Sequence, residues 1–121
     1  FKEHTDMDVR LNVTGSEQRL SPYLEVMIFR AVQELLGNVS RHSQASQVKV
    51  RLDITERQVR VSVEDNGRGF DVEDLLEHKG VGLKLIKDRV DMLGGHLDVD
   101  SAPSEGTRIA FDVPASWSNN L

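Results

Sequence analysis

Four short segments of this sequence carry the residue types that could do chemistry. They are ELLGNVSRH at 34–42, EDNGRGF at 64–70, GVGL at 80–83 and EGT at 105–107. Glycine pairs let a backbone approach a ligand closely, and the start of a helix offers unpaired N–H groups to an anion. Each segment alone is equally typical of a solvated helix face, a turn or a helix start. Their function therefore depends on whether folding brings them together.

Asp65 is the most unusual of these residues, because it lies where a hydrophobic core is expected. Val59, Val61 and Val63 share one face of a predicted strand, and Asp65 continues the same phase. Burying an unpaired charge is unfavourable, so this carboxylate must end the strand at a cavity, find a buried donor, or bind something that enters from outside. A purely structural alternative is that it caps the turn DNGRG.

A long helix must position the first segment. Ser21 is a plausible cap with Pro22 at the first helical position, and Glu34 and Asn38 follow four residues apart. This spacing places both side chains in one sector of the helix, which Arg41 and His42 extend. The predicted inner face of this helix is apolar and consists of Leu24, Ile28, Ala31, Leu35 and Val39.

The other elements follow from alternation and from turn residues. Strands are predicted around 9–13, 48–54, 59–65, 97–99 and 109–113, with a hairpin turn at 55–58. A second helix is predicted from about Gly82 to Leu93 and ends at Gly94-Gly95. Strands gathered with two helices indicate an α+β sandwich with a largely antiparallel sheet covered on one face. The predicted inner face of the second helix consists of Leu85, Ile86, Val90 and Leu93.

Composition limits the possible functions. The 121 residues predict one globular domain, residues 1–121, and the formal charge of -5 disfavours nonspecific nucleic-acid binding. Zero cysteines exclude disulfides, thiolate chemistry and cysteine-ligated zinc. No apolar run approaches the roughly 18 residues of a membrane span. Because the chain begins at Phe1 and has no signal-like segment, it is interpreted as a fragment of a longer protein.

Together and in this order, the motifs resemble the ATP-binding catalytic domain of sensor histidine kinases. That family belongs to the superfamily that also holds gyrase and MutL ATPases, and its fold is called the Bergerat fold. The resemblance is strongest to nitrate-sensor and lipid-fluidity-sensor kinases, in which E-x-x-x-N-x-x-[KR]-H, DNGxGF, a short lid, G-x-G-L, LGG and G-T follow one another. It extends from about Val9 to Pro114. It implies a two-layer α+β sandwich with a mixed, mostly antiparallel sheet covered on one face by helices.

The resemblance also implies roles for individual residues. Asp65 would accept a hydrogen bond from the adenine amino group, which discriminates adenine from guanine. Asn38 would give its side-chain oxygen to Mg²⁺, and Glu34 would be catalytic, although the base of a histidine kinase can instead lie beside the acceptor histidine. A short lid would lie between Phe70 and Gly80. The remaining residues implied to bind ATP are Arg41, His42, Gly67, Gly69, Phe70, Lys79, Gly80, Val81, Gly82, Leu83 and Thr107.

The phosphate acceptor is not expected in this sequence. None of His4, His42, His78 and His96 belongs to an H-[DE] pair on a predicted helix, and the resembled subfamily keeps its acceptor on an upstream dimerisation domain. We therefore expect a domain of a two-component kinase that binds Mg-ATP and transfers the γ-phosphate to that upstream histidine, from which a response regulator would receive it. The isolated domain is expected to be a cytoplasmic monomer, and the full-length protein a homodimer, whether or not unseen segments anchor it to a membrane.

Other functions of the same fold remain open at this point. An anti-sigma-factor-type kinase would phosphorylate a serine of a partner protein. An ATPase clamp like gyrase or MutL would dimerise with ATP, although those proteins carry longer lids and further domains. A degenerate binding module would have lost catalysis, against which the intact Glu34, Asn38 and Asp65 argue.

Overall fold

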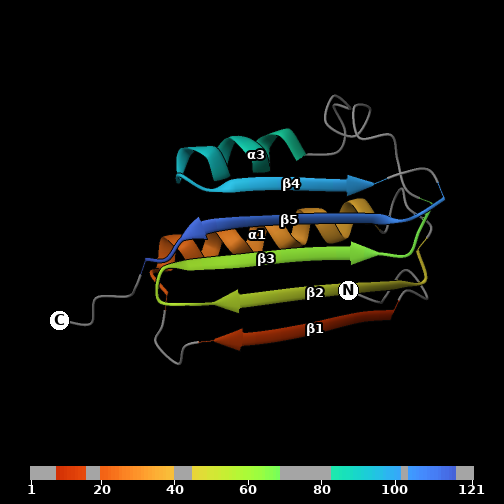
Figure 1. The fold of residues 1–121 in the computed structure, drawn as a ribbon, viewed down its shortest axis with the longest axis horizontal. Coiled ribbons are helices and arrows are strands. Elements are labelled where there is room, and N and C mark those ends of the chain that lie inside the picture. Colours follow the sequence, from red (N-terminus) through yellow and green to blue (C-terminus); the bar gives the residue numbers. More distant parts are fainter. Residues whose placement is uncertain (1–7, 16–19, 40–44, 69–82, 102–103, 117–121) are drawn as a thin grey trace.

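The structure, a computed structural model, describes residues 8–15, 20–39, 45–68, 83–101 and 104–116. Five strands form one sheet in the order β1-β2-β3-β5-β4 (Figure 1). β1 and β2 are parallel, and every other neighbouring pair is antiparallel. The elements are β1 (Asp8–Gly15), α1 (Pro22–Asn38), β2 (Gln47–Ile54), β3 (Gln58–Asp65), α3 (Leu83–Met92), β4 (His96–Ser101) and β5 (Thr107–Pro114).

α1 begins and packs as its sequence predicts. The Ser21 hydroxyl accepts a hydrogen bond from the Leu24 N–H at 3.4 Å, and Pro22 occupies the first helical position. The cap satisfies one of the N–H groups that have no partner within the helix. All five residues predicted for the inner face are buried, which confirms this part of the prediction: Leu24, Ile28, Ala31, Leu35 and Val39.

One face of the sheet packs in the hydrophobic core. Val61 of β3 lies opposite Phe111 of β5, and Val63 lies opposite Ile109; all four side chains are buried. The apolar sides of both helices belong to the same buried cluster. The opposite face carries polar and charged residues. The mixed sheet with helices on one face therefore confirms the α+β class.

The prediction for the second helix was wrong at Leu85. The buried residues of α3 are Leu83, Ile86 and Val90, whereas Leu85 is 58% exposed. At about 100° per residue, Leu83 and Val90 lie close to one direction and Leu85 lies on the opposite side of the helix. Leucine occurs on both sides of this helix, and packing on the sheet selects the side that contains Leu83. Leu93, also predicted inward, packs against the core while remaining partly exposed.

Backbone hydrogen bonds form the carboxyl end of α3 and the turn between β2 and β3. Gly94 has φ +80°, and the N–H of Gly95 donates to the Val90 carbonyl at 2.9 Å, so the helix ends where the glycine pair predicts. At the hairpin, the Thr55 N–H donates to the Gln58 carbonyl at 2.9 Å.

Neither described helix has the length and apolarity required of a membrane-crossing helix.

Candidate functional site

Several of the predicted site residues lie at the same end of the sheet. Asp65 is the last residue of β3 and Thr107 is the first residue of β5, and the two are register partners. The carboxyl end of α1, at Asn38, and the amino end of α3, at Leu83, point toward this end as well (Figure 1). The fold therefore gathers segments that are far apart in the sequence.

At this end, the apolar face of the sheet becomes polar. The register places Asp65 between Val48 of β2 and Thr107, and Thr107 beside Ser101 of β4. Asp65 and Thr107 are each only 6% exposed. The hydroxyl oxygens of Ser101 and Thr107 are 2.7 Å apart, within one hydrogen bond. We call Asp65, Thr107 and Ser101 the polar row.

The structure shows which groups contact the buried Asp65 carboxylate. Its carboxylate accepts a hydrogen bond from the Gly67 N–H at 2.8 Å, so it does cap the turn that follows β3. Burial raises the pKa of the Asp65 carboxyl, while hydrogen bonds from the backbone N–H groups of Gly67 and Thr107 act in the opposite direction. A carboxylate has about four lone-pair positions, and the two described N–H partners occupy two of them. The turn cap and a ligand contact are therefore compatible.

Gly106 allows β5 to approach the end of β3. Its φ is +79°, and a Cβ at this position would lie 2.3 Å from the Asp65 carbonyl oxygen. Real Cβ atoms essentially never approach that closely. The Ser101 hydroxyl donates to the Gly106 carbonyl at 3.1 Å, which ties this glycine to the polar row. Gly106 thus positions Asp65 through the backbone.

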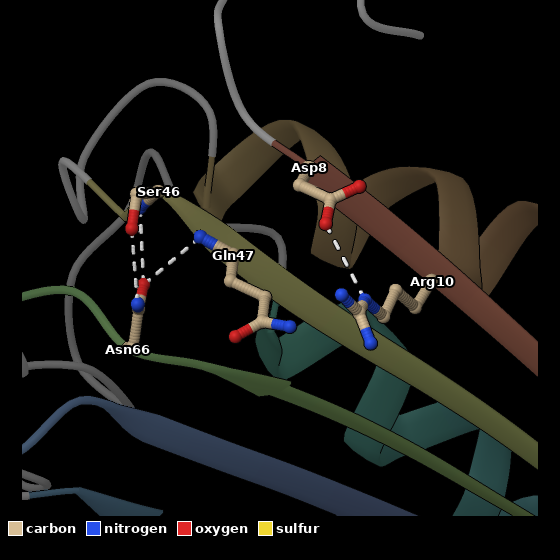
Figure 2. A network of polar contacts seen from close by, with 5 residues as sticks. All are labelled: Asp8, Arg10, Ser46, Gln47 and Asn66. Atoms are coloured by element: carbon tan, nitrogen blue, oxygen red, sulfur yellow. Dashed lines mark hydrogen bonds and ion pairs between the residues drawn. The ribbon is translucent and has the colours of Figure 1, made fainter.

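Asn66 fixes the end of β3 against the start of β2. Its side-chain oxygen accepts hydrogen bonds from the N–H groups of Ser46 and Gln47, both at 3.0 Å, and its amide donates to the Ser46 hydroxyl at 3.0 Å (Figure 2). Its own N–H donates to the Gln47 carbonyl at 3.3 Å. The residue directly after Asp65 is therefore held by four hydrogen bonds to β2 and the segment before it.

Glu34 lies in a groove between α1 and α3. The groove has a volume of about 840 Å³. Arg30 lies one helical turn before Glu34, Gly37 lies toward the end of α1, and Ile86 and Arg89 contribute from α3. Neither Asp65 nor Thr107 is among the described residues that line it.

The other predicted site residues differ in how far the structure describes them. Asn38 ends α1 one turn after Glu34, and Leu83 is a core residue that is 1% exposed. Among the described residues, no group of three or more His, Cys, Asp or Glu side chains could hold a metal ion. The lid and eight predicted binding residues lie outside the described residues: Arg41, His42, Gly69, Phe70, Lys79, Gly80, Val81 and Gly82.

Three residues of this end of the sheet were missed from the sequence as site residues. Ser101 continues the phase of Leu97 and Val99 on β4, so the same core-phase pattern that distinguishes Asp65 also indicates Ser101. Gly106 precedes Thr107 in the EGT segment, where a glycine between a turn and a strand can indicate a close approach. Asn66 lies within the DNG sequence, but nothing local indicates its partners in β2.

The sequence is similar to a known protein family and to individual members of it. The sequence profile described as "Histidine kinase-, DNA gyrase B-, and HSP90-like ATPase" matches residues 24–116. The "Signal transduction histidine-protein kinase/phosphatase DegS" of Brevibacillus brevis is 37% identical over 114 residues, which cover 94% of this chain and 29% of that protein. This chain thus spans under a third of that relative's length.

Solved structures show the same architecture. The histidine kinase domain of the Erythrobacter litoralis EL346 blue-light activated histidine kinase superposes with a TM-score of 0.67 at 27% identity, covering 88% of this chain and 51% of that one. The ATP binding domain of PrrB from Mycobacterium tuberculosis superposes with a TM-score of 0.71 at 23% identity, covering 93% and 82%. At that identity the second likeness concerns the fold alone.

Proposed function

We propose a function from one premise: this chain belongs to the family of histidine kinase-, DNA gyrase B- and HSP90-like ATPases. It is the ATP-binding catalytic domain of a two-component sensor kinase. It binds Mg-ATP and presents the γ-phosphate to a histidine on a dimerisation domain upstream in the longer protein. The observation that carries the proposal is the buried Asp65 carboxylate at the end of a core strand.

The polar row binds the base. Asp65 retains acceptor capacity beside its two N–H partners, and the adenine amino group is the donor that it accepts from. Guanine carries a carbonyl at the corresponding position, and a carbonyl oxygen facing a carboxylate is repelled rather than bonded. The hydroxyl of Thr107, held by Ser101 at 2.7 Å, lines the same end.

The end of α1 and the start of α3 receive the phosphates. Mg²⁺ takes few protein ligands, and one amide oxygen, that of Asn38, would hold it together with phosphate oxygens and water. When bound, Mg²⁺ neutralises the charge that develops between the phosphates. Glu34 then orients or deprotonates the incoming imidazole. Arg41, His42 and Lys79 offset the triphosphate charge. The glycines at 67 and 69 allow close approach to the nucleotide, and those at 80 and 82 hinge the lid and offer backbone N–H groups to the phosphates.

The role of Asp65 can be tested by calorimetry. Asp65→Asn should weaken ATP binding by about 1–3 kcal/mol, because a charge-assisted hydrogen bond is lost. Asp112→Asn is a matched control, since that carboxylate lies on β5 but on the opposite face of the sheet. ATP affinity should be unchanged in the control. Wild-type affinity in a folded Asp65→Asn variant would remove Asp65 from the binding site.

The phosphate transfer can be tested with γ-labelled ATP. The domain alone should label none of its own histidines, and adding the upstream dimerisation domain should place label on that domain's histidine. Phosphohistidine is acid-labile and base-stable, which distinguishes it chemically. Acid-stable label on a serine of a partner would instead support the anti-sigma-type kinase, and rapid hydrolysis with ATP-dependent dimerisation would support a clamp.

The wider setting is proposed on the same premise. The phosphorylated histidine passes its phosphate to a response regulator, and the catalytic domain works in the cytoplasm, where ATP is available. The full-length protein is a homodimer formed through the upstream domain.

A further inference from the structure

β1 forms an outer edge of the sheet with an apolar side that is exposed. Among the described strands it pairs only with β2. Leu11 is the register partner of Val50, and Val13 of Leu52, so both point to the face that elsewhere carries the core. Leu11 is nevertheless 69% exposed and Val13 54% exposed. Figure 1 shows why, since α1 and α3 lie over the half of the sheet away from β1.

The two edges of the sheet differ in how they could pair with another strand. β4, the opposite edge, has His96, Asp98 and Asp100 on its open face. Like charges would repel a second copy of β4, which is a common protection of edge strands. β1 carries two charges of opposite sign on its open face, Asp8 and Arg10, which pair with each other at 3.3 Å (Figure 2). β1 has eight residues and contains no proline, so its sequence does not block pairing.

We propose that β1 is a self-association edge, at which two copies of this chain pair their β1 strands antiparallel about a two-fold axis at Asn12. This register places Leu11 of each copy directly opposite Val13 of the other, on the face that carries both cores. The two exposed apolar side chains of one strand therefore cover those of its partner. A shift of one residue would face them with side chains of the polar face.

The charges on the open face fit the same register. Arg10 lies opposite Thr14 of the other copy, and the Thr14 hydroxyl donates to Asp53 on β2. That hydrogen bond and the nearby Arg51 guanidinium lower the pKa of the Asp53 carboxyl, so it is ionised at neutral pH. Arg10 of each copy thus faces a hydroxyl–carboxylate pair of the other. The pairing is complementary in both apolar contacts and charge.

The contact is small. One strand pair with four apolar side chains buries less than the roughly 800 Å² per partner of a standard specific interface. Self-association of the isolated chain should therefore be weak, with monomer dominant at micromolar concentration. Any tether that holds two copies together raises the effective concentration and populates the paired state. No nucleotide is required, so the inference does not depend on the proposed kinase function.

Disulfide trapping tests the register. The wild-type chain has no cysteine, so Asn12→Cys introduces a single thiol that meets its own copy at a cross-strand distance suited to a disulfide. His96→Cys is the matched control on the other edge, where the side chain is 81% exposed. In a thiol–disulfide buffer without nucleotide, the Asn12→Cys chain should form far more linked dimer than the control. Equal trapping of both variants would overturn the proposal.

A second variant tests the apolar contact. Leu11→Lys in the Asn12→Cys background should reduce the trapped dimer by about tenfold, because a charge replaces a covered apolar side chain. Met92→Lys, at a residue that is 84% exposed on α3, should leave trapping unchanged. Sedimentation of the wild-type chain up to millimolar concentration provides an independent measurement. A strictly monomeric wild type, or equal loss with Met92→Lys, would refute the edge pairing.

Discussion

Replacing Gly106 by alanine should disturb Asp65 without removing any polar group. Gly106 has φ +79°, which is strained for alanine, and its added Cβ would lie 2.3 Å from the Asp65 carbonyl oxygen and 3.4 Å from the Asn66 Cα. The nearest atom is backbone, so no flexible side chain can move aside. The end of β3 and the start of β5 must separate, and the Asp65 carboxylate moves with its backbone.

Gly94 provides a control that separates the two costs of this substitution. Its φ is +80°, and a Cβ there would meet nothing within 4 Å. Gly94→Ala should therefore cost only the left-handed conformation, about 1–2 kcal/mol. Gly106→Ala adds an overlap of the kind that costs about 1–3 kcal/mol, giving roughly 2–5 kcal/mol in total. The smaller unfolded-state entropy of alanine affects both variants equally and cancels in the difference.

Two measurements decide the matter. Urea unfolding should show a lower free energy of unfolding for Gly106→Ala than for Gly94→Ala, and calorimetry should show weaker ATP binding only for Gly106→Ala. Equal unfolding free energies for the two variants would refute the close approach. A loss of stability at Gly106 with undiminished ATP affinity would refute the claim that this glycine positions Asp65 for binding.

Three further predictions concern named contacts. Burial raises the folded-state pKa of Asp65 above 3.8, so the folded state holds the Asp65 proton more tightly than the unfolded state does. The stability that this proton contributes should therefore be present at low pH and should fall as pH rises through the folded-state pKa. Urea unfolding across pH should show this contribution in wild type but not in Asp65→Asn. Asn66→Ala should lower the free energy of unfolding by about 1–3 kcal/mol through the loss of three side-chain hydrogen bonds, whereas Asn66→Asp, which keeps the acceptor oxygen, should cost less in the same assay. Ile86→Ala should destabilise by about 2–5 kcal/mol and Leu85→Ala by less than about 0.5 kcal/mol; equal costs would contradict the observed orientation of α3.

The parts of the fold that could be predicted are those fixed by local periodicity. The inner face of α1, its Ser21 cap and the valine phase of β3 each depend on residues within one element, and all three are confirmed. The hairpin turn at 55–58 is likewise local. Such patterns survive folding because the tertiary contacts reinforce the preference that is already present.

What could not be predicted depends on how elements meet. Leu85 and Leu83 both fit an apolar helix face, and only contact with the sheet selects Leu83. The parallel pairing of β1 with β2 cannot be predicted from the sequence of either strand alone. Asn66 reads as a turn residue, although its partners Ser46 and Gln47 lie about twenty positions earlier in the chain. The roles proposed for Arg41, His42 and the lid glycines stay predictions.

Strand phase connects these observations to the candidate site. On β3, β4 and β5 the side chains that face the helices are apolar until the final row, where Asp65, Ser101 and Thr107 appear together. A polar residue at the end of one core-phased strand has several explanations, including a turn cap. Fewer explanations account for polar residues at the ends of three adjacent strands in one register row, because each buried polar group must find a partner. Ser101 and Thr107 satisfy each other, while the described partners of Asp65 are two backbone N–H groups, fewer than the roughly four lone-pair positions of a carboxylate. Within the described residues, the polar row is therefore satisfied by its own hydrogen bonds, and the proposed recognition of an exocyclic amino group would use a lone pair of Asp65 beyond these two N–H contacts.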